Sequence, residues 1–75
     1  MRDKGEFFRG RDRYLFEPFE CALFRWDHHS RTVWMKLAGQ GFEVQVPHDH
    51  RIFNEAVLSG REIDKMSYDS GMVAD

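Results

Sequence analysis

Hydrophobic and polar residues alternate along three runs in the middle of the chain, which is the pattern of β-strands with one buried and one exposed face. The runs cover residues 19–26, 32–37 and 42–46, and a polar segment and a glycine-containing segment separate them. Short connections of this kind between alternating runs are typical of β-hairpins. The sequence therefore predicts a three-stranded antiparallel meander.

A fourth strand is predicted before the meander. Tyr14, Leu15 and Phe16 favour extended structure, and Pro18 follows them closely. Because proline has no amide proton to donate to a central ladder, we expect this segment to be a strand at the edge of the sheet.

A helix is predicted over residues 50–59. Its apolar positions recur at helical spacing: Ile52, Phe53, Ala56 and Val57. Asp49 is the expected N-cap, and Gly60 is the expected stop. A helix this short is stable only when its apolar stripe docks on the sheet. Residues 61–69 fit either a second short helix or an irregular segment, and residues 70–75 are expected to fray.

These elements predict an α+β fold, in which a small antiparallel three- to four-stranded β-meander is packed by one C-terminal α-helix. A small half-open β-barrel with a helix is the alternative. We interpret residues 1–13 as a basic N-terminal arm, residues 14–69 as the single α+β domain and residues 70–75 as a tail.

The alternation also assigns the two faces of the predicted sheet. The residues expected to face the helix are Phe19, Cys21, Leu23, Val33, Met35, Leu37, Phe42, Val44 and Val46. The opposite face would then carry Ala22, Phe24, Trp26, Trp34, Glu43 and Gln45. An antiparallel sheet usually presents polar side chains on its second face. We therefore predict that Phe24, Trp26 and Trp34 form a partner-binding surface, because large aromatic side chains carry much of the energy of protein interfaces.

An alternative interpretation covers that aromatic face from within the chain. The N-terminal segment could fold back over it through Phe7, Phe8, Tyr14 and Phe16. The two interpretations are compatible in part.

Composition restricts the class of protein. The 75 residues carry 11 basic and 13 acidic side chains, for a net charge of −2, and 41% of them are hydrophobic. A chain of this size forms one small domain, and its composition is that of a folded protein rather than a disordered tail. The mildly acidic balance gives no global positive field to attract nucleic acid or an acidic membrane.

The single cysteine, Cys21, excludes an intrachain disulfide and favours a reducing compartment. We expect it to pack in the core rather than act as a nucleophile. The charged N-terminus lacks the apolar run of a signal peptide, and no run is long enough to cross a bilayer. These features predict a cytoplasmic protein.

Two histidine clusters offer donors for a metal ion, namely His28, His29, His48 and His50. In a meander, the first connection and the end of the third strand lie at the same end of the sheet, so the clusters could meet. The simpler interpretation is that these are turn residues and residues flanking a helix cap.

Arginines beside an aromatic residue are typical of proteins that track a nucleic-acid backbone and stack a base. Here the candidates are Arg9, Arg11, Arg13 and Tyr14. Asp12 interrupts the cluster and the rest of the chain is acidic, so a solvated arm is the simpler interpretation.

The sequence carries no convincing set of catalytic residues and has no phosphate loop or dinucleotide motif. We therefore predict a small non-enzymatic protein-protein interaction module without a cofactor, which regulates or inhibits a larger protein. A single-stranded nucleic-acid-binding module and a metal-binding domain are the alternatives.

Overall fold

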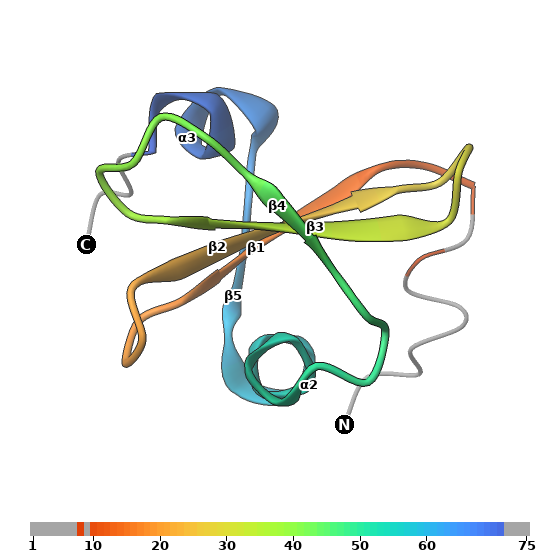
Figure 1. Ribbon diagram of the computed structural model, residues 1–75, viewed down its shortest axis with the longest axis horizontal. Coiled ribbons are helices and arrows are strands. Elements are labelled where there is room, and N and C mark those ends of the chain that lie inside the picture. Colours follow the sequence, from red (N-terminus) through yellow and green to blue (C-terminus); the bar gives the residue numbers. More distant parts are fainter. Residues whose placement is uncertain (1–7, 9, 72–75) are drawn as a thin grey trace.

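The computed structural model describes residue 8 and residues 10–71 (Figure 1). The elements are β1 (Arg13–Glu17), β2 (Ala22–Asp27), β3 (Thr32–Leu37), β4 (Val44–Val46), α2 (Arg51–Ser59), β5 (Arg61–Ile63) and α3 (Lys65–Ser70). The strands form one five-stranded antiparallel sheet with the order β4-β3-β2-β1-β5. The predicted α+β fold with an antiparallel meander and a helix is confirmed.

The connection between β1 and β2 shifts the phase of the second strand. Pro18 follows β1 directly, and Cys21 takes a left-handed φ of 52°, which interrupts the alternation. As a result β2 starts at Ala22, and Ala22 and Phe24 join the core beside α2. The face assignment for residues 19–26 is therefore wrong, and so is the placement of Cys21 in the core, because its side chain is exposed.

One side of the sheet packs against α2. The buried cluster there consists of Phe8, Leu15, Ala22, Phe24, Val33, Val46, Phe53, Ala56 and Val57, with Trp26, Met35 and Ile52 packed at its margin. The predicted stripe of α2 thus docks on the sheet as expected. The face assignment is correct for Val33, Met35 and Val46, since these residues belong to or border this core.

The ends of α2 differ in part from the prediction. The N-cap is His50 rather than Asp49, because the Nδ1 atom of His50 accepts a hydrogen bond from the Phe53 amide at 3.4 Å. At the other end, a Cβ atom on Gly60 would lie 2.6 Å from the Ala56 carbonyl oxygen and 2.8 Å from that of Phe16. Glycine is therefore the residue that lets the helix exit closely against β1.

The other side of the sheet carries α3, and Figure 1 shows α2 and α3 on opposite sides. The chain reaches this side through β5, which pairs with β1. β1 is therefore an internal strand, and its predicted edge position is wrong. Asp64 caps α3 by accepting a hydrogen bond from the Ser67 amide at 2.8 Å, and Tyr68 is buried beneath the helix.

Among the described residues, no helix combines the length and apolar composition needed to span a bilayer.

Candidate protein-binding surface

The three aromatic residues predicted to form a binding surface do not share a face. Phe24 is 1% exposed and its ring lies 5.5 Å from that of Phe53, inside the core. Trp26 pairs with Val33, whereas Trp34 pairs with Arg25. Because directly paired residues point to the same side of a sheet, the two indoles lie on opposite sides. The expected common aromatic face is therefore wrong, as a consequence of the phase shift at Cys21.

Trp26 is covered from within the chain. Its indole lies 5.0 Å from the ring of Phe8, and its Nε1 atom donates a hydrogen bond to the Phe8 carbonyl oxygen at 3.1 Å. The ring of His48 meets it edge-on at 5.4 Å. The alternative cover by the N-terminal segment is thus confirmed at Phe8. Phe7 lies outside the described residues, and Tyr14 belongs to the side of the sheet that carries α3.

Trp34 belongs to a charged and aromatic network on the side of α3. The guanidinium carbon of Arg25 lies 5.5 Å from the centre of the Trp34 ring. Arg25 also binds the carboxylate of Glu43 through Nε at 3.2 Å and through a terminal nitrogen at 2.7 Å. Tyr68 donates its hydroxyl to the same carboxylate, and the ammonium group of Lys36 lies 4.4 Å from the centre of the Tyr68 ring.

These contacts keep Glu43 and Arg25 charged and Tyr68 protonated. Burial alone would raise the pKa of Glu43, but the hydrogen bonds from Arg25 and Tyr68 outweigh it, so the pKa lies below its ordinary value. Burial and the bond to Glu43 raise the pKa of Tyr68. The hydrogen bond to Glu43 raises the pKa of Arg25. The network therefore fixes the Trp34 ring beside Arg25 and holds α3 against the sheet.

The predicted metal-ligating histidines have separate roles. His28 contacts the Asp12 carboxylate through Nδ1 at 2.6 Å, and its ring lies tilted against that of His29, with the ring centres 4.1 Å apart. His48 contacts the Arg31 carbonyl oxygen through Nε2 at 2.7 Å, and His50 caps α2. Over residue 8 and residues 10–71, no three histidine, cysteine or acidic side chains converge as metal ligands. In this part of the chain, the four predicted histidines therefore do not come together as a metal site.

The arginines predicted to bind nucleic acid are paired with an acid. Arg11 and Arg13 lie 3.6 Å and 2.7 Å from the same carboxylate oxygen of Glu62, while Arg9 lies outside the described residues. The ring of Tyr14 packs against that of Tyr68 at 5.4 Å. These contacts offset part of the positive charge of the two arginines and place the Tyr14 ring against Tyr68.

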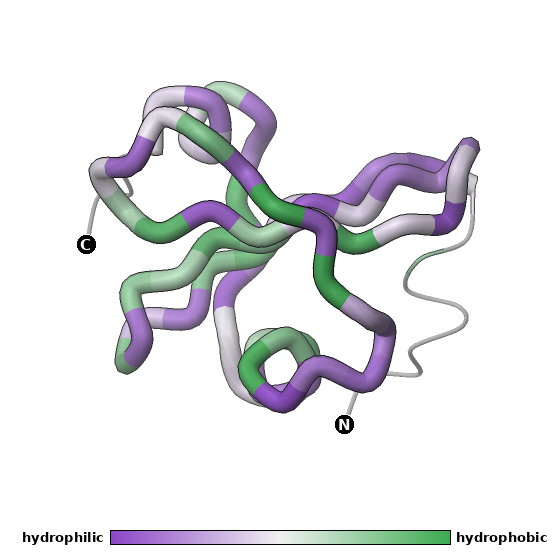
Figure 2. The backbone as a smooth tube through the Cα atoms, in the orientation of Figure 1, coloured by the Kyte–Doolittle hydropathy of each residue, from purple (hydrophilic) through white to green (hydrophobic). Residues whose placement is uncertain are grey.

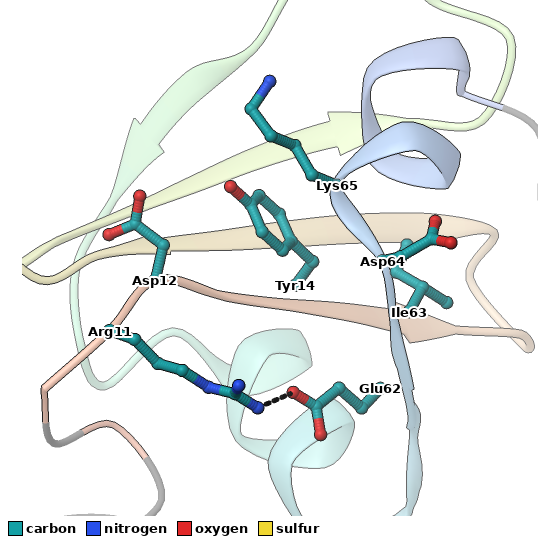
Figure 3. A pocket seen from close by; sticks show the side chains of 7 residues that line it. All are labelled: Arg11, Asp12, Tyr14, Glu62, Ile63, Asp64 and Lys65. Atoms are coloured by element: carbon teal, nitrogen blue, oxygen red, sulfur yellow. Dashed lines mark ion pairs between the residues drawn. The ribbon is translucent and has the colours of Figure 1, made fainter.

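A pocket of about 350 Å³ lies beside Arg11 (Figure 3). Its lining residues are Arg11, Asp12, Tyr14, Glu62, Ile63, Asp64 and Lys65. The charged groups already have partners within the chain, since Glu62 binds the arginines, Asp64 caps α3 and Lys65 pairs with Asp69 at 2.6 Å. Asp12, the remaining charged residue, contacts His28, so these charged residues of the pocket already make contacts within the chain.

Comparison with known proteins identifies the family. The Tis1 immunity protein family matches residues 1–72. The chain belongs to the Tis1 immunity protein family. The immune protein Tis1 of Pseudomonas aeruginosa (strain UCBPP-PA14) is 40% identical over 70 residues, which cover 92% of this chain and 91% of that relative.

A solved structure resembles this Tis1 family member over nearly its whole length. It is the crystal structure of the complex between the Type VI effector Tas1 and its immunity protein. The matching chain is 39% identical and has a TM-score of 0.87, and the match covers 96% of each chain. The sheet and both helices described above are therefore the fold of a protein that was solved in a complex with an effector.

In this Tis1 family member, exposed apolar side chains gather at one end of the sheet. The described residues include six exposed large hydrophobic side chains, namely Phe19, Leu37, Phe42, Val44, Leu58 and Met66. The first four belong to the β1–β2 turn, the end of β3, the β3–β4 connection and the start of β4, which lie at the same end because the strands are antiparallel. We call these four residues the apolar end.

Sequence reasoning missed the apolar end because it predicted all four of its residues to pack against the helix. Leu37 and Val44 do pair with residues of that side, Ala22 and Met35, but both side chains are exposed. Phe19 is instead 93% exposed in a turn, and Phe42 is 63% exposed before β4 begins. A signal was present, since Pro18 marks the chain next to Phe19 as a turn rather than as the first position of a strand.

Proposed function

We propose that this chain is an immunity protein that binds and neutralises a type VI effector similar to Tas1. The observation that carries the proposal is the similarity to a chain of the Tas1 complex, which extends over 96% of each chain at a TM-score of 0.87. A similarity of this extent includes the whole sheet and both helices, so it favours the same mode of action rather than a shared fold alone.

Neutralisation by binding needs a stable surface of sufficient area. A standard protein interface takes about 800 Å² from each partner. The accessible surface of this chain is 4947 Å², so one interface of that size would occupy a modest part of it. The sheet is held rigid on both sides, by the network of Arg25, Glu43 and Tyr68 on one side and by the docked helix α2 on the other. A surface that is ordered before binding lowers the entropic cost of the interface.

We also propose that Trp34 contacts the effector. Its side chain is only half-buried, its Nε1 atom donates to the hydroxyl of Thr32 at 2.9 Å, and Arg25 lies against its ring. An indole fixed in this way can bind a partner without losing further rotamer freedom.

We propose that the protein acts in the cytoplasm of the cell that it protects. The support is chemical, because the single cysteine is exposed and carries no disulfide. An exposed thiol persists most readily in a reducing compartment.

Protection of growing cells tests the proposed function. Bacteria that express Tas1, or the Tas1-like effector of this chain's own host, would be co-transformed with this chain or with an empty vector. We expect the chain to restore growth against at least the host effector, and the purified chain to elute with that effector from a sizing column. Growth arrest despite normal amounts of the folded chain, with no joint elution, would contradict the proposal.

A further inference from the structure

We infer that the effector docks on the apolar end, through a contact centred on Phe19 and Phe42. The inference rests on the proposed function, because that function supplies the occupant of the surface. It goes further by assigning the contact to particular residues.

The register of the sheet brings the residues of the apolar end together. Met35 pairs with Val44 at the start of β4, and Leu37 pairs with Ala22 at the end of β3, so Val44 and Leu37 lie at the same end of the sheet. Val44, Leu37 and Phe42 are 44%, 41% and 63% exposed, so each presents apolar surface to solvent at this end.

Phe19 extends this surface from the neighbouring hairpin. Ala22, at the start of β2, pairs with Leu37, and the Ala38 amide donates a hydrogen bond to the Cys21 carbonyl oxygen at 2.8 Å. The β1–β2 turn is therefore fastened to the end of β3. In Figure 2 the tip of this turn carries a hydrophobic colour, whereas the turn between β2 and β3 is hydrophilic.

The backbone beneath the apolar end is held by hydrogen bonds. The Glu20 amide donates to the carboxylate of Glu17 at 2.7 Å, and Glu17 itself is only 2% exposed. On the neighbouring loop, the Gln40 amide donates to the Leu37 carbonyl oxygen at 3.0 Å. Phe19 is thus presented outward by an ordered turn, as expected of an anchor that is formed before binding.

The chemistry of the apolar end favours a protein partner with an apolar surface. Isolated exposed hydrophobic residues are common, but four large ones on connections at one end of the sheet, two of them phenylalanines, indicate an interaction site. β4 is the last strand of the sheet, so its outer backbone edge continues this surface. Val44, Gln45 and Val46 contain neither proline nor lysine, the residues that usually protect an exposed edge from pairing.

A matched pair of double variants tests the inference. Phe19→Ser with Phe42→Ser removes the two aromatic anchors of the apolar end. Leu58→Ser with Met66→Ser makes the same kind of change on α2 and α3, at side chains that are 60% and 80% exposed. Affinity for the Tas1-like effector of the same host is measured by biolayer interferometry, with the unfolding temperature as the check on folding and a sizing column as the check on self-association.

We expect the apolar-end variant to lose about 100-fold or more in affinity, and the helix variant to stay within about threefold of the wild type, with unchanged unfolding temperatures. Equal binding by wild type and apolar-end variant would overturn the inference while leaving the proposed function intact. Equal losses in both variants would overturn the location. A wild-type dimer that the apolar-end substitutions dissociate, with effector binding unchanged, would identify a second copy as the occupant. A wild-type chain that binds no effector would refute the proposed function itself.

Discussion

The two ends of the sheet use their turns in opposite ways. At the end formed by the β2–β3 turn, the Asp27 carboxylate accepts hydrogen bonds from the His29 and Ser30 amides at 3.0 Å and 3.3 Å, and His28 binds Asp12. At the apolar end, the turn satisfies its backbone and presents Phe19 to solvent. The polar end thus uses its side chains for contacts within the chain, whereas the apolar end leaves large apolar side chains exposed, and we propose that a partner covers them.

The largest effect expected from a single substitution is at Phe19. We expect Phe19→Ala to weaken effector binding by about 2 kcal/mol, the loss of a typical aromatic anchor, because no contact within the chain compensates. Its unfolding temperature should stay within about 2 °C of wild type, since the side chain is 93% exposed. Calorimetric titration and thermal unfolding give the two values, and His29→Ala at the polar end is the control. A large loss of stability in Phe19→Ala would show that the ring packs on the chain instead.

The next effect is expected at Glu17, which lies beneath the turn. Glu17→Ala removes the acceptor of the Glu20 amide, so we expect about 1–2 kcal/mol less stability and a moderate loss of affinity, although no exposed side chain is changed. Denaturant unfolding measures the first quantity and titration with the effector the second. If the Glu17→Ala variant is less stable but binds the effector with wild-type affinity, then recognition does not depend on the order of this turn.

The stability that Glu43 contributes through its contacts with Arg25 and Tyr68 should decrease in acid. The pKa of Glu43 lies below its ordinary value of 4.5, so the native state binds fewer protons than the unfolded chain and its stability rises with pH. The contribution is complete above that ordinary value and is lost as the pH falls through the lower native value. We therefore expect Glu43→Gln to destabilise the protein by about 1–2 kcal/mol at pH 7 and by less at pH 3.

Unfolding experiments at these two pH values check the expectation for Glu43. Glu55→Gln is the control, because Glu55 forms an exposed pair with Arg51 on α2 at 3.4 Å. An equal destabilisation by Glu43→Gln at both pH values would contradict the role of the ionised carboxylate.

The smallest effects are expected at the polar end. His28→Ala should cost less than about 1 kcal/mol and leave effector binding within about twofold, because the pair with Asp12 is partly exposed to solvent. The pKa of Asp12 is lowered first by the backbone amide of His28 and then by its side chain, so it should remain below 3.8 in the variant. Carbon-detected NMR titration measures that pKa, and a value above 3.8 would contradict the assigned cause.

Alternation was enough to predict the strands, but not their phase. β3 spans Thr32–Leu37 as predicted, because a polar turn precedes it in the sequence and a glycine-containing connection follows it. In β2 the predicted alternation starts at Phe19 and runs through a turn that contains Cys21 in a left-handed conformation. Ala22, Phe24 and Trp26 are therefore predicted on the side opposite the helix, whereas they lie in or beside the core under α2. A single residue at positive φ therefore decided which aromatic side chains are buried.

The elements that the sequence did not predict depend on contacts distant along the chain. β5 has only Arg61, Glu62 and Ile63, and becomes a strand because it pairs with β1. The apolar end combines two connections that are neighbours only after the sheet has formed. The predicted role as a protein-binding inhibitor agrees with the family, but alternation within single strands could not locate a surface built from separate turns.

Hydrogen–deuterium exchange of the full chain, with and without the effector, tests the central claim most directly. The account predicts that binding slows exchange at the amides of residues 18–21 and 37–44, while residues 28–31 exchange at the same rate as in the free protein. Slower exchange at residues 28–31, with the apolar end unchanged, would contradict it.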